Sequence, residues 1–157
     1  MNKHQLTKFL GKAQLNTYAG GGAEIKPAEK EFHDLEYKEG DWYYKDSYAG
    51  HYQSWGRETV WYKNKPVWTQ LYGGGIEEKL HNNKSLDTKL YSFLKKAMSA
   101  GDKENTFQPR GPIRFTDKDF KYECEWEGDI QKFKGNEKIF FKEEIVFTHN
   151  FIGGTFE

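Results

Sequence analysis

The carboxylate of Asp46 interrupts what is otherwise the aromatic face of a predicted strand in this 157-residue chain. Side chains alternate between the two faces of a strand, so one face of segment 42–48 carries Trp42, Tyr44, Asp46 and Tyr48. Burying a lone carboxylate among rings is costly, and it requires a partner, a raised pKa or an open cleft. Such a face suits a cationic or flat ligand. Two alternatives stay open: a bulge that turns Asp46 to solvent, and a hydrogen bond to a tyrosine hydroxyl.

Glu58 and Glu137 are two further acids on predicted strand faces, each among branched and aromatic neighbours. If those faces line the interior, the two carboxylates could meet and serve general acid-base catalysis. Acids at such positions more commonly face solvent or a lysine. We expect that second arrangement for both residues.

A histidine with nearby acids occupies segment 33–37, HDLEY. His33, with Asp34 and Glu36 beside it, could act as a proton shuttle or as one metal ligand. A metal site needs further ligands at a characteristic spacing, and no second histidine stands at one. Nothing in the sequence places His149 near His33. We therefore expect no metal and no cofactor.

An internal repeat relates the two halves of the chain. Residues 41–75 align with residues 119–154 with Lys134 as the only insertion, and eleven positions are identical. Upstream, FLGKA at 9–13 matches FLKKA at 93–97. Positions that differ in polarity between the two copies are candidates for function, and Asp46 opposite Cys124 is the clearest of them.

Each copy reads as one helix followed by antiparallel strands. Residues 6–13 and 90–97 carry apolar side chains at i, i+3, i+4 and i+7, which is the stripe of a helix that packs on a sheet. We predict an α+β fold: one domain over residues 1–157, made of repeats at about 5–75 and 86–154. The two helices would cover a continuous or barrel-like antiparallel sheet with pseudo-twofold symmetry. A cleft is expected near the local axis.

Composition excludes several classes of function. Lys and Arg total 24, as do Asp and Glu, so the chain lacks the positive charge of a nucleic-acid-binding protein. The mean hydropathy is −0.98, and no apolar run is long enough to cross a membrane. The N-terminal segment has no signal-peptide pattern, and Cys124 is the only cysteine. We expect a cytoplasmic protein whose core is built from its many aromatic rings.

Five motifs resemble an uncharacterised bacterial family. They are TYAGGGAE (17–24), HDLEY (33–37), DSYAG (46–50), GRETVW (56–61) and KPVW (65–68). The family is a domain of unknown function, found alone or fused behind helix-turn-helix regulators of the xenobiotic-response-element type. The resemblance implies no established activity, and the fusion implies an effector-sensing module. Leu71-Tyr72-Gly73 departs from the family's usual aromatic pair before the glycine, which alters the local pocket.

These observations favour a cytoplasmic domain that binds a small molecule rather than an enzyme. One alternative is a carboxylate-based enzyme acting on a sugar, nucleotide or amide, and another is a dimerisation or scaffold module. The expected partners are a small-molecule ligand and, as an open alternative, a second copy of the chain, with no nucleic acid and no membrane. The predicted binding residues are His33, Glu36, Trp42, Tyr44, Asp46, Tyr48, Glu58, Trp61 and Trp68.

Overall fold

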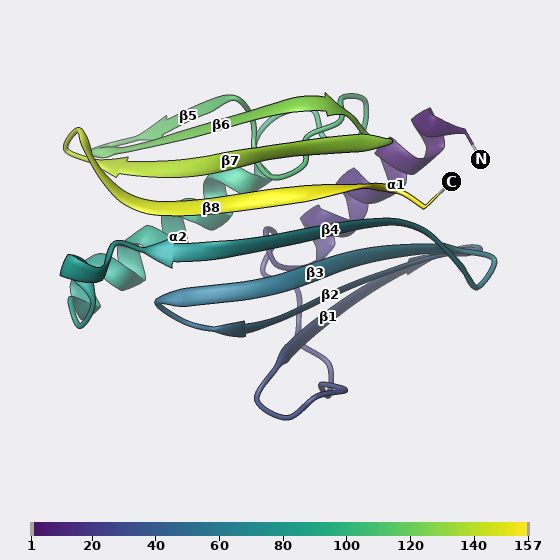
Figure 1. Ribbon diagram of the computed structural model, residues 1–157, viewed down its shortest axis with the longest axis horizontal. Helices are drawn as coiled ribbons and strands as arrows, with labels where there is room; N and C mark the ends of the chain where they lie inside the picture. Colours follow the sequence, from purple (N-terminus) through teal and green to yellow (C-terminus); the bar gives the residue numbers. More distant parts are fainter. Residues whose placement is uncertain (1, 157) are drawn as a thin grey trace.

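Eight antiparallel strands form one open sheet in the computed structural model, which describes residues 2–156 (Figure 1). The sheet order is β1-β2-β3-β4-β8-β7-β6-β5. The helices are α1 (Lys3–Asn16) and α2 (Lys84–Ser99), and a short 3-10 helix spans Glu78–Leu80. The strands are β1 (His33–Glu39), β2 (Trp42–Gly50), β3 (Gln53–Tyr62), β4 (Lys65–Ile76), β5 (Arg114–Asp117), β6 (Phe120–Asp129), β7 (Lys132–Phe141) and β8 (Glu144–Thr155). The α+β prediction is confirmed, and the sheet is open rather than closed into a barrel.

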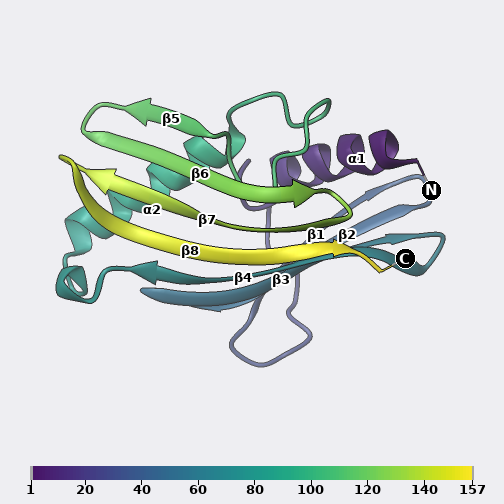
Figure 2. The same cartoon turned by 45° about the horizontal axis from the view of Figure 1, so that its top comes forward.

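The two halves of the chain contribute matching sets of elements to this sheet. Each half supplies one helix and then four consecutive antiparallel strands, and the halves meet where β4 pairs with β8. Figure 2 shows β4 and β8 side by side at the middle of the sheet. A repeat would produce this arrangement, but a common origin of the two halves remains a prediction.

Both helices pack on the same face of the sheet (Figure 1). Helix α1 buries Leu6, Phe9, Leu10 and Ala13, and α2 buries Leu90, Phe93, Leu94 and Ala97, which are the two predicted stripes. The side chain of Asn2 accepts a hydrogen bond from the backbone of His4, and the side chain of Asn83 accepts one from the backbone of Leu86. These caps satisfy N–H groups that the first turn of a helix leaves unpaired.

Tight turns set the register of the central hairpins. Lys63 and Asn64 join β3 to β4 with φ of 51° and 63°, and Lys142 and Glu143 join β7 to β8 with φ of 48° and 69°. Two consecutive residues with positive φ match the twist of the strands that they connect.

Aromatic rings fill the space between helices and sheet, and they also appear on the other face. Trp68, Tyr44, Tyr122 and Phe147 are among the largest fully buried side chains. On the face without helices, Trp55 is 65% exposed, and Leu71 and Ile152 are also exposed. Within residues 2–156, neither helix has the length and apolarity that crossing a bilayer requires.

A leucine in α1 tests how far the core depends on this helix. Leu10 is buried and Leu71 is exposed, so Leu10→Ala removes core contacts and Leu71→Ala does not. We expect Leu10→Ala to lower the free energy of unfolding by about 2–5 kcal/mol and the control to change it by less than about 0.5 kcal/mol. Urea titrations followed by tryptophan fluorescence measure both. Equal effects of the two substitutions would contradict this packing.

Candidate functional site

Two rows of facing positions cross the sheet on its helix-covered side. Pairing in register defines the first, which we call the histidine row: Gly50, Ser54, Gly74, His149, Glu137 and Cys124. The second, the glutamine row, runs in the opposite sense: Gly128, Phe133, Gly153, Gln70, Glu58 and Asp46. The rows match position by position. They share a glutamate and two glycines and differ in the other three places.

This register corrects the position of the inserted residue in the sequence alignment. The extra residue lies in the turn between β6 and β7, because Gly50 pairs with Ser54 while Gly128 pairs with Phe133. Trp55 therefore does not match Phe133, and the two lie on opposite faces: Trp55 is exposed and Phe133 is buried. Phe133 instead has the place that Ser54 has in the other half.

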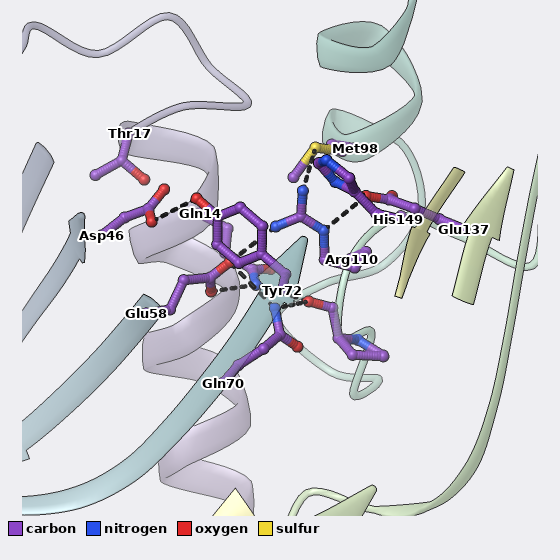
Figure 3. Close-up of polar contacts among 12 residues, drawn as sticks. Gln14, Thr17, Asp46, Glu58, Gln70, Tyr72, Met98, Arg110, Glu137 and His149 are labelled. Carbon is purple, nitrogen blue, oxygen red and sulfur yellow. Dashed lines mark hydrogen bonds and ion pairs between the residues drawn. The ribbon is translucent and has the colours of Figure 1, made fainter. Parts of the chain in front are cut away.

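Arg110 joins the two rows. It lies in the segment between α2 and β5 and is buried. Its Nη1 donates to Glu58 Oε1 at 3.1 Å, and its Nε donates to Glu137 Oε1 at 2.9 Å (Figure 3). The guanidinium also lies over the ring of Tyr72, 4.3 Å from the ring centroid. One cation thus neutralises a carboxylate from each half of the sheet.

Neutral and cationic donors surround Glu58. Gln14 Nε2 and Gln70 Nε2 each donate to this carboxylate at 3.2 Å, and each also donates to the carbonyl oxygen of Pro109. Lys103 Nζ donates to Gln14 Oε1 at 3.0 Å and to the carbonyl oxygen of Arg110. Burial lowers the pKa of Lys103 to about 8, although Glu58 opposes that change. Glu58 therefore has little capacity left for a substrate.

Glu137 has a different set of partners. Tyr122 donates its hydroxyl hydrogen to Glu137 Oε2, and His149 Nδ1 lies 3.2 Å from Glu137 Oε1. Burial raises the pKa of Glu137, but Arg110 and the hydrogen bonds from His149 and Tyr122 outweigh it and bring the pKa to about 2. Burial lowers the pKa of His149, against the opposing effect of Glu137. Glu137 is therefore ionised and His149 neutral near pH 7.

Asp46 is buried at the wall of a cavity. Its side chain is 3% exposed, and its Oδ1 accepts a hydrogen bond of 2.8 Å from the Tyr72 hydroxyl (Figure 3). Burial and then the charge of Glu58 raise the pKa of Asp46 to about 8, although Tyr72 and Arg110 favour the ionised form. Of the alternatives open from the sequence, the tyrosine hydrogen bond and the cleft both hold, and the bulge to solvent is wrong.

The cavity, called here the Asp46 cavity, has a volume of about 320 Å³. That volume lies at the small end of the range for ligand-binding sites. The sheet and α2 supply most of its wall, and Tyr18 and Arg110 come from the segments that follow the two helices. It is lined by Tyr18, His33, Asp46, Tyr48, Gly50, His51, Ser54, Tyr72, Tyr91, Leu94, Lys95, Arg110 and His149.

Three predicted site residues meet in this cavity: Asp46, Tyr48 and His33. The rings of His33 and Tyr48 stack with centroids 5.0 Å apart, and His33 Nδ1 lies 3.0 Å from Glu24 Oε1. His149 lines the same cavity, so the fold brings two histidines together that the sequence did not. Among residues 2–156, no group of three or more His, Cys, Asp and Glu residues is arranged to hold a metal ion.

The other predicted aromatic residues lie outside the cavity. Tyr44 and Trp68 are fully buried in the core. Trp42 packs on Phe9 of α1, with ring centroids 5.2 Å apart. Trp61 contacts Tyr43 across the helix-free face.

The two predicted glutamates also lie outside the cavity wall. Glu36 lies on the helix-free face, with one carboxylate oxygen 3.8 Å from Lys38 Nζ. Glu58 is directly opposite Asp46 in the register, but its carboxylate binds Arg110. The expectation that Glu58 and Glu137 face solvent is wrong, because one arginine from the linker compensates both charges inside the protein.

The residues of the site that escaped the sequence reasoning include Arg110, Tyr72, His149 and Ser54. A signal existed for Tyr72 and His149, since the predicted repeat aligns them with Phe151 and Gln70, two further differences in polarity. None existed for Arg110, because the linkers of the two copies do not align. Ser54 was obscured by the misplaced insertion.

Comparison with known protein families identifies one match. The model described as "Domain of unknown function (DUF5680)" matches residues 46–156. This stretch runs from within β2 to the end of β8 and includes Asp46, Ser54, Arg110 and His149. Neither curated proteins nor solved structures gave a significant match.

Removing Arg110 tests whether its charge holds the two halves together. Arg110→Met leaves two buried carboxylates without their cation, so we expect a loss of about 3–5 kcal/mol in the free energy of unfolding. Adding Glu58→Gln and Glu137→Gln should restore part of that loss. The control is Lys3→Met, which removes an exposed ion pair to Asp129 and should cost at most about 1 kcal/mol. Urea unfolding measures all three, and a cost for Arg110→Met no larger than the control's contradicts this role.

The pH dependence of stability tests the environment of Asp46. Its pKa is about 8 in the folded protein against an ordinary value of 3.8, so folding favours the protonated form. The stabilisation from that proton is complete below about pH 4 and is lost as the pH rises toward about 8. Between these limits wild type should lose stability relative to Asp46→Asn, by at most about 1.4 kcal/mol per pH unit.

Urea unfolding from acid to mildly alkaline pH measures this difference. Asp41→Asn is the matched control, because Asp41 is exposed and its removal should leave the shape of the pH curve unchanged. Parallel curves for wild type and Asp46→Asn would show that Asp46 titrates as in the unfolded chain.

Proposed function

We propose that this chain, which belongs to the family described as "Domain of unknown function (DUF5680)", binds a small organic molecule in the Asp46 cavity. One observation carries the proposal: a buried carboxylate lies at the wall of a cavity that Tyr18, Tyr48, Tyr72 and Tyr91 also line. The resemblance to domains fused with transcription regulators supports an effector as the ligand. The molecule bound at Asp46 would then act as a signal.

The charge balance of the site favours a ligand with one positive charge. Glu58 and Glu137 are balanced by Arg110 and Lys103, all four of them buried. Asp46 adds a further carboxylate beside this cluster, to which Tyr72 connects it. When it ionises, the cluster gains an uncompensated negative charge, which a protonated amine at Asp46 would neutralise.

The hydrogen bonds of Asp46 leave room for such a group. Its Oδ1 accepts from Tyr72, and its second carboxylate oxygen, Oδ2, would bind the ligand amine. Lys95 also lines the cavity, and its Nζ lies over Tyr18, 5.0 Å from the ring centroid. Its positive charge would repel a ligand amine from that end of the cavity. The amine would therefore approach Asp46 rather than Tyr18.

Aromatic rings would hold the apolar part of the ligand. The Tyr18 and Tyr48 rings meet edge to face with centroids 6.0 Å apart, and Tyr91 lines the same cavity. Stacked or edge-on contacts with these rings bury flat apolar groups. The ligand class is thus a small aromatic or alicyclic amine.

Paired probes test the proposal. We expect 2-phenylethylamine to raise the melting temperature of the wild-type protein at millimolar concentration, because a ligand that binds only the folded state stabilises it. Its neutral analogue 2-phenylethanol should bind about tenfold more weakly, since it lacks the charge that Asp46 pairs with. Asp46→Asn should remove this preference, whereas Glu36→Gln, on the helix-free face, should retain it.

Isothermal titration in buffers of different ionisation enthalpy adds a second measurement. Amine binding should release a proton, because the cation favours ionised Asp46. Equal binding of the amine and the alcohol, or the same preference in Asp46→Asn, contradicts a role for Asp46. No stabilisation by either probe at saturating concentration counts against the amine class.

A further inference from the structure

Ser54 and His149 meet across a strand that has no side chain between them. Ser54 on β3 and His149 on β8 both pair with Gly74 of β4, which lies between the two strands. Gly74 has φ of +131°, a conformation that favours glycine. Ser54 Oγ and His149 Nε2 lie 3.3 Å apart over this gap.

The hydrogen bonds of Glu137 determine which nitrogen of His149 carries the proton. Ionised Glu137 can only accept hydrogen bonds, so Nδ1, 3.2 Å from its Oε1, must be the donor. In the neutral imidazole, Nε2 then holds a lone pair that can accept the hydroxyl hydrogen of Ser54. The order hydroxyl, imidazole and carboxylate is that of an activated serine nucleophile.

The glutamine row shows that the framework does not require this pair. Where the histidine row has Ser54 and His149, the glutamine row has Phe133 and Gln70, while both rows keep the glutamate that binds Arg110. A phenyl ring and an amide hold their strands in the same register. The serine and the histidine therefore occur together in one half without being needed to bind the arginine.

Ser54 and His149 also line the Asp46 cavity, and so does Arg110. We propose that Ser54 is a nucleophile for acyl transfer, with His149 as its general base and Glu137 as the positioning residue, and that it hydrolyses small carboxylic esters which enter this cavity.

The reaction would proceed in two balanced steps. Ser54 Oγ forms a bond to the ester carbonyl carbon while its proton passes to His149 Nε2, and the bond from carbon to the alcohol oxygen breaks as the alcohol takes that proton. Water then attacks the acyl-serine, gives one proton to His149, and releases the carboxylic acid as that proton returns to Ser54. The net change is ester plus water to acid plus alcohol.

Arg110 can stabilise the oxygen that becomes negative in each step. Among the described residues its Nη2 contacts Met98 Sδ at 3.8 Å, and a thioether is a weak acceptor. A donor bound so weakly could exchange the thioether for a substrate oxygen that approaches it, at little cost. Because Nε and Nη1 remain on Glu137 and Glu58, the guanidinium would stay in place.

A neutral ester tests this step independently of amine binding. On mixing wild-type protein with 4-nitrophenyl acetate, we expect a rapid release of 4-nitrophenolate and one acetyl group on Ser54, located by peptide mass spectrometry. Ser54→Ala should remove both. His149→Gln should slow acetylation of Ser54 by about 100-fold, and the glutamine has a precedent in Gln70. Ser92→Ala, on the exposed side of α2, is the control and should react like wild type.

The pH profile separates catalysis from a structural role. The rate of acetylation should rise with pH as His149 loses its proton. The midpoint of this rise should lie below the ordinary pKa of a histidine, because burial lowers the pKa of His149. Glu137 from β7, Arg110 from the linker and Tyr72 from β4 face the imidazole and influence this value. His149→Gln should abolish that step in the profile while its circular dichroism spectrum stays that of wild type.

A fluorophosphonate covers the case in which the acetate ester reacts elsewhere. It should label Ser54 in wild type and leave Ser54→Ala unlabelled. The proposal is wrong if neither probe modifies Ser54 in folded wild-type protein, or if folded Ser54→Ala releases 4-nitrophenolate as fast as wild type. Loss of amine binding in Asp46→Asn has no bearing on either outcome, so the two proposals fail separately.

Discussion

The ion pairs of Arg110 with Glu58 and Glu137 connect the two halves of the sheet through one buried cation. Two carboxylates lie inside the protein, one on each half of the sheet, and neither could remain ionised there without a cation. Arg110 supplies that cation from the linker between α2 and β5. Gln14 of α1 and Met98 of α2 contact the same cluster, so the two helices and both halves of the sheet converge on one guanidinium.

The cavity lies beside this cluster and shares residues with it. Tyr72 connects the two, since its hydroxyl binds Asp46 while its ring lies under Arg110. The two rows have a glutamate and two glycines at matching positions, and the two glutamates bind Arg110. Asp46, Ser54 and His149 face the cavity from positions where the other row has Cys124, Phe133 and Gln70. The chemistry of the site thus resides in the places where the two halves differ.

Prediction from the sequence succeeded where neighbouring residues decide the outcome. The helices around Phe9 and Phe93 follow from stripes at a spacing of three and four. The inward face of Asp46 follows from the alternation of a strand. Glu58 and Glu137 were misjudged, because a local pattern shows which face of a strand a side chain is on but does not show which distant charge it meets.

The helices, the strand pattern and the acid on an aromatic face can be read from the chain, because they depend on side-chain periodicity within a few residues. The positions of Arg110 between two glutamates and of Ser54 beside His149 over Gly74 can be read only from the fold. Those contacts depend on strand register and on the path of a linker with no counterpart in the other half. Ser54 and His149 are 95 positions apart in the chain, and only the pairing of β3, β4 and β8 brings them together.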